Sequence, residues 1–257
     1  MSNYQTISVE REAHVVTVTL KRPESLNAIT SQMLREVTEA YSNLEDNVRV
    51  VVLKGSGRAF CSGADRMDPP GLAPSGSDHM TELFHAGEGR RAARAIAEAP
   101  MTTIASLHGH VIGGGAVLAL NCDFRLGDES TTIRFPEVQL GIPLTWGALP
   151  LLEREVGASK ARRMVYFGDP VHASEALEIG FLHEVVAIEH LAEATQNFAG
   201  KLLELPEIAV RMSKRQLLKA SEAETGRLAA LDTLDSELYV EAMRYGWKPF
   251  RGSMARN

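Results

Sequence analysis

Two glycine-containing loops have the residue types that bring backbone N–H groups close to a bound oxygen. The stretch "HGHVIGGGAVLAL" (108–120) sets three glycines before a short apolar run, and "CSGAD" (61–65) follows an apolar strand pattern. Glycine costs about 0.5–1 kcal/mol relative to alanine inside a helix, so a tripled glycine indicates a close approach of another group. Two N–H groups that converge on one oxygen form an oxyanion hole. For either loop alone, a simple turn is the favoured explanation.

The sequence before the first loop begins like a dinucleotide-binding motif but does not complete it. In "VVVLKGSGRAF" a strand pattern leads into Gly55 and Gly57, but Phe60 stands where the third glycine of G-x-G-x-x-G belongs. The following "CSGADRMDPP" is a polar turn where that motif requires a helix. We therefore reject a nucleotide-redox interpretation.

Taken together and in order, the motifs resemble the enoyl-CoA hydratase/isomerase (crotonase) superfamily. The resemblance rests on "HVVTVTLKRPESLNAIT", "GSGRAFCSGAD", "APMTTIASLHGHVIGGGAVLALNCDFRLG", "FPEVQLGIP" and "ASEALEIGFLHEVV", and it ends at "YGWKPF". It therefore covers essentially the whole chain. It is specific for the superfamily and much less so for the reaction, because this scaffold hosts many acyl-CoA chemistries.

The resemblance implies the fold, the assembly and the oxyanion hole. It implies an α/β fold: a crotonase-like spiral of ββα units with a helical C-terminal trimerisation region. Residues 1–195 would form the core with the CoA and active sites, and 196–257 the helical region. A homotrimer or a dimer of trimers is expected. The oxyanion-hole donors would be the N–H groups of Ser62 and Gly114. No cofactor is expected, since coenzyme A is part of the substrate.

One carboxylate stands where the family's hydratases use two. Glu137 in "FPEVQLG" matches one catalytic glutamate, whereas Val117 replaces the other in "GGGAV". Glu137 follows Phe135-Pro136 and precedes an apolar stretch, so we expect it to be half-buried with a raised pKa, as suits a proton shuttle. A single carboxylate suffices to move a proton between two carbons, whereas hydration must also hold and deprotonate water.

Further residues are assigned to the substrate by the resemblance. Trp146 is bulkier than the residue usual there, which implies a shortened or reshaped acyl pocket; it is also explained as core filler. Coenzyme A carries phosphates, so cationic side chains are expected at the pocket mouth. The residues expected along the CoA path are Arg22, Ala64, Asp65, Arg66, Met67, Lys248 and Phe250. Asp65 is also expected to cap the turn of its loop.

Composition limits the partners. The 257 residues carry a net charge of −6, with 44% hydrophobic and 23% charged residues, which argues against nucleic acid or an anionic membrane as partner. Two cysteines, Cys61 and Cys122, give no disulfide framework. The histidines lack the spacing of a metal site. No signal-peptide pattern or membrane-spanning run is present, so a cytoplasmic location is expected.

Strands and helices alternate around these motifs. Residues 14–20, 48–55, 101–109 and 181–186 have strand patterns, and "CDFRLGDESTTIRF" supplies two more short strands. Helical patterns cover 31–47, 81–98, 114–121 and three segments between 147 and 180. Residues 66–80 are rich in proline, glycine and serine and are expected to form a surface loop. From 189 to 245 the pattern is helical throughout.

Three functions follow as hypotheses. The leading one is an acyl-CoA enzyme that stabilises a thioester enolate and uses Glu137 for isomerisation or single-base hydration or dehydration. An ordinary trans-2-enoyl-CoA hydratase is the first alternative. A non-catalytic acyl-CoA-binding protein is the second; Val117 favours it and Glu137 opposes it.

Overall fold

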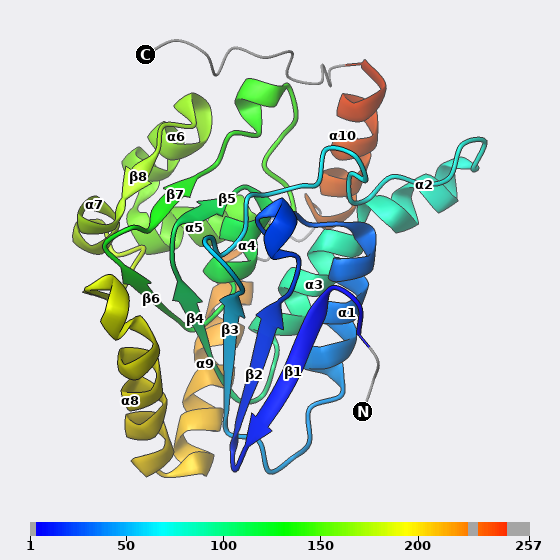
Figure 1. Ribbon diagram of the computed structural model, residues 1–257. Helices are drawn as coiled ribbons and strands as arrows, with labels where there is room; N and C mark the ends of the chain where they lie inside the picture. The colour runs from blue at the N-terminus through cyan, green and yellow to red at the C-terminus, as the bar shows by residue number, and fades with distance from the viewer. Residues whose placement is uncertain (1–3, 226–230, 246–257) are drawn as a thin grey trace.

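A twisted sheet that links distant parts of the sequence forms the centre of the fold (Figure 1). The computed structural model describes residues 4–225 and 231–245. In it the main sheet has the order β1-β2-β3-β4-β6-β9, with β1 and β2 antiparallel and the other pairs parallel. Its strands are β1 (Ile7–Glu12), β2 (Val15–Leu20), β3 (Val50–Gly55), β4 (Thr102–Leu107), β6 (Phe124–Asp128) and β9 (Glu184–Val186).

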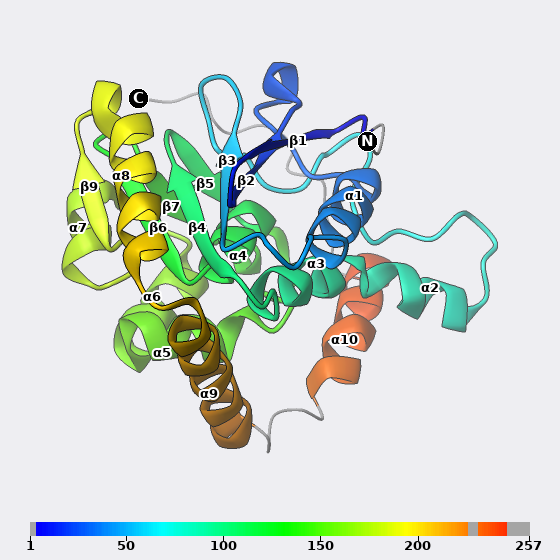
Figure 2. The same cartoon turned by 90° about the horizontal axis from the view of Figure 1, so that it is seen from below.

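Alternating side chains of the strands face two different layers of helices. On β3, Val51 and Leu53 belong to the main core with residues of α1 (Ser31–Ser42), α3 (Glu88–Ala97) and α4 (Gly114–Leu120). Val50 and Val52 instead pack with α8 (Leu191–Glu204). A strand presents successive side chains to opposite faces, so an unbroken apolar strand requires cover on both. Figure 2 shows α1 and α3 on one side of the sheet and α8 on the other.

A second, smaller sheet brings three loops to one place. It has the order β5-β7-β8, from β5 (His110–Ile112), β7 (Thr132–Arg134) and β8 (Val171–His172). The parallel register pairs Ile112 with Arg134, and Gly113 N–H donates to Arg134 O at 2.8 Å. Cys61 forms a parallel bridge with Val111. The segments that follow these three positions, 61–65, 113–115 and 135–137, therefore end up side by side.

The remaining helices surround this core. They are α2 (His79–Ala86), α5 (Ala148–Val156), α6 (Ala158–Phe167), α7 (Ala173–Glu178), α9 (Glu207–Thr225) and α10 (Leu231–Tyr245), with 3-10 turns at Pro23–Ser25, Val138–Leu140 and Ile188–His190. Lys214 ties α9 to the core through Asp123 at 2.6 Å. Tyr239 ties α10 to the loop before α2 by donating to Pro70 O at 2.9 Å.

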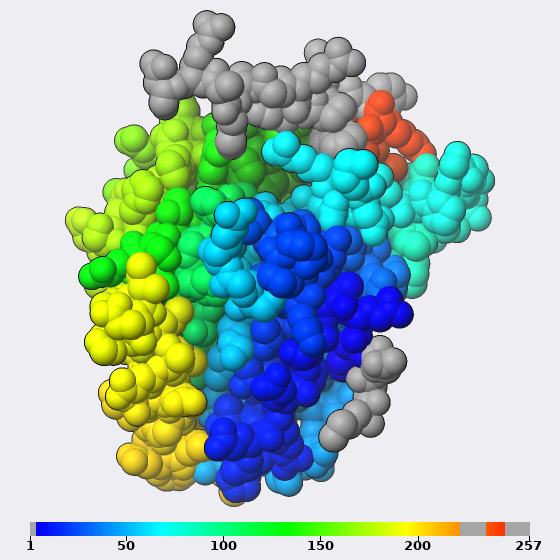
Figure 3. Space-filling view, in the orientation of Figure 1, coloured from blue at the N-terminus to red at the C-terminus, as the bar shows by residue number. Residues whose placement is uncertain are grey.

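The structure agrees with the expected crotonase-like spiral and differs in two boundaries. The helix expected at 81–98 is two helices that meet at Gly87, and Figure 3 shows α2 projecting from the side of the molecule. Residue 195, the expected end of the core, lies inside α8, and Leu191 and Ala199 of that helix both pack on the sheet. Leu205 and Pro206 separate α8 from α9.

In residues 4–225 and 231–245, no helix combines the length and the apolar character that crossing a bilayer requires.

Candidate active site

Each of the three consecutive glycines makes room for a different neighbour. A Cβ at Gly113 would lie 2.8 Å from Glu137 Oε1, and the φ of Gly113, +54°, also disfavours any side chain. A Cβ at Gly114 would lie 2.6 Å from Trp146 Cη2. A Cβ at Gly115 would lie 2.6 Å from Cys61 Cβ. The bare backbone thus lets a carboxyl group, an indole ring and the first loop converge on the start of α4.

The N–H of Ala64 is free and belongs to a loop that lies close to those glycines. Gly63 O accepts from Ile29 N–H at 2.8 Å, and in a trans peptide the next N–H points the opposite way, so Ala64 N–H points away from Ile29. The preceding Gly63 approaches the glycines, since a Cβ at Gly113 would lie 3.9 Å from Gly63 Cα. Ala64 is exposed, and within the described part of the chain its N–H has no hydrogen-bond partner.

The N–H of Ser62 is not available, which corrects the expectation for the first donor. It donates to Leu26 O at 3.0 Å. The change of direction occurs at Gly63, whose φ of +92° turns the peptide that follows it. Ala64, expected only along the CoA path, therefore offers the donor that was assigned to Ser62.

The N–H of Gly114 is the second free donor. Gly114 is the first residue of α4, and the first N–H groups of a helix have no partner within it. Gly113 N–H is engaged by Arg134 O, and among the described residues no group accepts from Gly114 N–H. Gly114 is half-buried and follows Gly113 directly, as Ala64 follows Gly63. The close approach of Gly63 and Gly113 thus brings the two free donors together.

Glu137 points its carboxyl group into this junction. Its Oε2 is buried and has no hydrogen-bond partner among the described residues, although the residue as a whole is half-buried. Burial raises the pKa of Glu137 to about 7, against a small opposing effect of its own backbone N–H. Glu137 is half-buried, as expected, and burial shifts its pKa in the expected direction. Glu137 O accepts from the N–H groups of Leu140 and Ile142, which fixes the backbone beneath the side chain.

Val117 places hydrocarbon one helical turn after Gly113. The carbonyl of Gly113 accepts the Val117 N–H at 3.0 Å, and helical side chains lean back toward the preceding turn. Val117 is 1% exposed, so the position of the missing glutamate is buried and apolar.

Arg22 and Asp65 hold the first loop rather than projecting from it. Arg22 Nη1 donates to Asp65 Oδ2 at 2.8 Å and to Ala28 O, and Asp65 Oδ1 accepts from Met67 N–H at 2.9 Å. Burial acts to raise the pKa of Asp65, but these hydrogen bonds outweigh it and the pKa is lowered. Asp65 thus caps the turn as expected, and the pair orients the peptide that carries the Ala64 N–H.

The remaining residues expected along the CoA path fall into two groups. Arg66 and Met67 follow Asp65 at the surface, and Met67 is 93% exposed. Lys248 and Phe250 lie outside the described residues.

Trp146 lies on the other side of Gly114 and is held from α10. Its φ is +61°, and the next residue, Gly147, donates its N–H to Asp235 Oδ2 at 2.9 Å. The bulk of Trp146 is visible in the sequence, but the part played by Asp235 is not. An aspartate some ninety positions away, on a helix with ordinary polar spacing, carries no signal of this contact.

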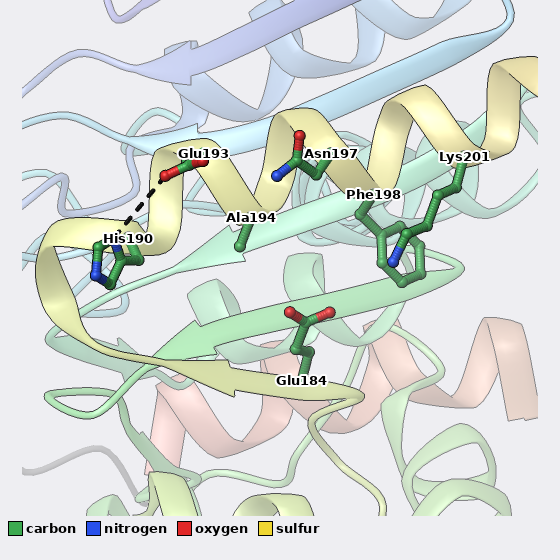
Figure 4. Close-up of a pocket in the computed structure, with 7 residues that line it drawn as sticks. All are labelled: Glu184, His190, Glu193, Ala194, Asn197, Phe198 and Lys201. Atoms are coloured by element: carbon green, nitrogen blue, oxygen red, sulfur yellow. Dashed lines mark ion pairs between the residues drawn. The ribbon is translucent and has the colours of Figure 1, made fainter.

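A separate pocket lies away from this junction. It has a volume of about 240 Å³, and its lining residues are Glu184, His190, Glu193, Ala194, Asn197, Phe198 and Lys201. Figure 4 shows these side chains on β9 and on α8 with the turn before it. None of the site residues above belongs to these elements. Among the described residues, no group of three or more histidine, cysteine or acidic side chains is arranged to hold a metal ion.

Comparison with known proteins shows the family of the chain. The family model described as enoyl-CoA hydratase/isomerase matches residues 10–245. The crotonyl-CoA hydratase of Syntrophomonas wolfei is 30% identical over 232 residues, covering 89% of this chain and 87% of that protein.

Solved structures match over nearly the whole chain. An enoyl-CoA hydratase from Bacillus anthracis superposes with a TM-score of 0.75 and 30% identity, covering 93% of this chain and 90% of that one. A structure from Thermobifida fusca YX, solved with acetoacetyl-CoA, superposes with a TM-score of 0.77 and 27% identity. The match covers 89% of this chain and 93% of that one. The chain therefore belongs to the enoyl-CoA hydratase/isomerase family of acyl-CoA enzymes and has the crotonase fold.

Proposed function

We propose that the protein binds an acyl-CoA thioester with its carbonyl oxygen between the N–H groups of Ala64 and Gly114, and that Glu137 alone transfers the proton. The observation that carries this proposal is the buried, unpartnered Oε2 of Glu137 at the meeting point of two glycine loops. An unpaired buried carboxyl oxygen is costly, and such groups gather at functional sites.

The leading reaction is isomerisation of a 3-enoyl to a 2-enoyl thioester. Glu137 takes a proton from C2, the electron pair of that C–H bond forms a C1–C2 double bond, and the π pair of the carbonyl moves to the thioester oxygen. The negative charge of this dienolate rests on the oxygen, where the two N–H groups stabilise it. When the carbonyl forms again, the C1–C2 pair moves to C2–C3 and the former C3–C4 pair takes the proton back from Glu137 at C4. Atoms and charge balance with one carboxyl group and no separate cofactor.

Hydration of a 2-enoyl thioester is the second candidate, because the crotonyl-CoA hydratase relative has that activity in its name. In a single-base version, Glu137 takes a proton from water as the oxygen bonds to C3, and then gives this proton to C2. The hydrocarbon at Val117 leaves the water without a second carboxylate to hold it, and this disfavours hydration. Dehydration is the same path reversed.

Binding of the rest of coenzyme A is proposed at the open side of Ala64. Arg66 and Met67 are placed to contact it, and the resemblance adds Lys248 and Phe250. A trimer or a dimer of trimers, and a cytoplasmic location, stay predictions.

One assay separates these reactions. The full chain is incubated with trans-3-enoyl-CoA and with trans-2-enoyl-CoA, and the products are followed by mass and absorbance. We expect a product of unchanged mass with conjugated absorbance from the 3-enoyl substrate. A gain of water from the 2-enoyl substrate would favour the hydratase. Binding of acyl-CoA without turnover of either would contradict the enzyme proposal and favour a non-catalytic binding protein.

Two variants test the roles of the residues. Glu137→Gln should lower kcat by about 10²–10⁴-fold while acyl-CoA affinity persists. Val117→Glu restores a second carboxylate and should raise the ratio of hydration to isomerisation at least about tenfold. Unchanged turnover in Glu137→Gln would remove Glu137 from the mechanism.

A further inference from the structure

The indole ring of Trp146 occupies space that two glycines on different helices leave open. A Cβ at Gly89 of α3 would lie 1.8 Å from Trp146 Cε2, and one at Gly114 of α4 would lie 2.6 Å from Cη2. The ring therefore bridges α3 and the donor at Gly114. It is half-buried and packs against the main core.

The backbone around Trp146 is fixed in an unusual conformation. Trp146 has a φ of +61° and Gly147 one of +69°, so two successive residues are left-handed. A bulky residue adopts this conformation only where its surroundings impose it. Here Gly147 N–H donates to Asp235 Oδ2 at 2.9 Å, and Arg90 Nη1 lies 3.9 Å from the same oxygen. Strain of this kind at a site residue points to a role beyond filling the core.

We propose that Trp146 forms the inner wall of the acyl pocket and restricts the enzyme to short acyl groups. This proposal rests on the proposed function. With the thioester oxygen between Ala64 and Gly114, the CoA moiety extends from the site toward the surface, where Ala64 and Met67 are exposed. The acyl group then extends inward, past Glu137, to the side of Gly114 that the ring covers. Ile29 adds to this wall, because its Cδ1 would lie 3.1 Å from a Cβ at Gly114.

The decisive experiment is a chain-length profile. The ratio of kcat/KM for ten-carbon over four-carbon enoyl-CoA is measured for wild type, Trp146→Ala and Trp146→Gly, using the double-bond isomer that the wild type converts. Glycine suits the left-handed backbone and guards against failure of the alanine variant to fold. Phe167→Ala, which removes an aromatic ring that is 63% exposed on α6, is the matched control.

We expect both Trp146 variants to raise this ratio at least about tenfold, the effect typical of steric discrimination in an apolar pocket, and the control to leave it unchanged. A wild type that prefers the ten-carbon substrate, or variants that keep the wild-type ratio, would overturn the proposal for Trp146 alone. A wild type that neither binds nor converts either substrate would instead refute the proposed function.

A double-mutant cycle of thermal stability tests the position of the Trp146 ring without any assay of activity. Gly89→Ala should lower the Tm of the wild type, because the methyl group and the indole cannot share one space. In the Trp146→Gly background the same substitution should lower the Tm much less or raise it, since alanine is the better helix former. Equal losses in both backgrounds would show that the ring lies elsewhere and would overturn the proposal.

Discussion

Glu137 Oε1 lies 2.8 Å from the point where a side chain of Gly113 would begin. The carboxyl group of the proposed base thus fits against a residue that has no Cβ, and that residue directly precedes the proposed donor at Gly114. Gly113 N–H is in turn fixed by Arg134 O, three residues before Glu137 in the chain. One contact at the end of the β5–β7 pair therefore positions both proposed groups.

Gly113→Ala should lower kcat by at least about 100-fold, because the methyl group displaces the carboxyl group and φ is +54°. Steady-state kinetics on the substrate that the wild type converts measures the loss. Gly200→Ala is the matched control, since a Cβ at Gly200 meets nothing within 4 Å and its helix should gain stability. Wild-type kcat in Gly113→Ala would show that the carboxyl group is not held at this contact.

The pH dependence of the reaction should follow Glu137. Because burial raises the pKa of Glu137 to about 7, the carboxylate that accepts the proton is lost as the pH falls below that value. We expect kcat/KM to fall about tenfold per pH unit below pH 7 and to level off above it. Initial rates between pH 5 and 9 test this. A profile that stays flat down to pH 5 would contradict a buried glutamate base.

The same burial should cost stability at high pH. Between the ordinary pKa of 4.5 and about 7, the folded state binds one more proton than the unfolded state, so the free energy of unfolding falls as the pH rises. The loss is about 3 kcal/mol at roughly 1.4 kcal/mol per pKa unit. It is absent below pH 4.5, where both states are protonated.

Glu137→Gln removes this proton linkage. The stability of the variant relative to wild type should therefore be greater at pH 8 than at pH 4.5, by an amount on the order of 3 kcal/mol. Urea unfolding at the two pH values measures it. Glu193→Gln, at a side chain that is 73% exposed, provides the control. A stability difference that does not change with pH would rule out the raised pKa.

Exchange of single backbone amides for esters distinguishes the Ala64 donor from Ser62. Replacing the Ala64 N–H by an ester oxygen should lower kcat/KM by about 10²–10³-fold with little change in stability, because this N–H has no partner in the described structure. The same exchange at Ser62 removes its bond to Leu26 and should cost about 1 kcal/mol of stability. The opposite pattern would return the donor to Ser62.

The ordered motifs predicted the fold, and they singled out the glycine loops and Glu137, which the structure brings together. They could not predict the direction of single peptide groups. Gly63 turns the chain at a φ of +92°, so the available N–H belongs to Ala64 and not to Ser62. Nor could the sequence show that Gly89 and Gly114 both lie against the indole ring of Trp146, because this contact joins two helices through a third segment. Local pattern fixes strand and helix, whereas such contacts depend on tertiary packing.

The most direct measurement of the central claim is hydrogen exchange at C2 of a saturated acyl-CoA in D₂O. Loss of that proton requires a base and a stabilised enolate, whichever reaction the enzyme completes. We predict that the wild type incorporates deuterium at C2 of butyryl-CoA, seen by mass and NMR, and that Glu137→Gln does so at least about 100-fold more slowly. Exchange at the same rate in both proteins, or none in a wild type that binds butyryl-CoA, would contradict the account.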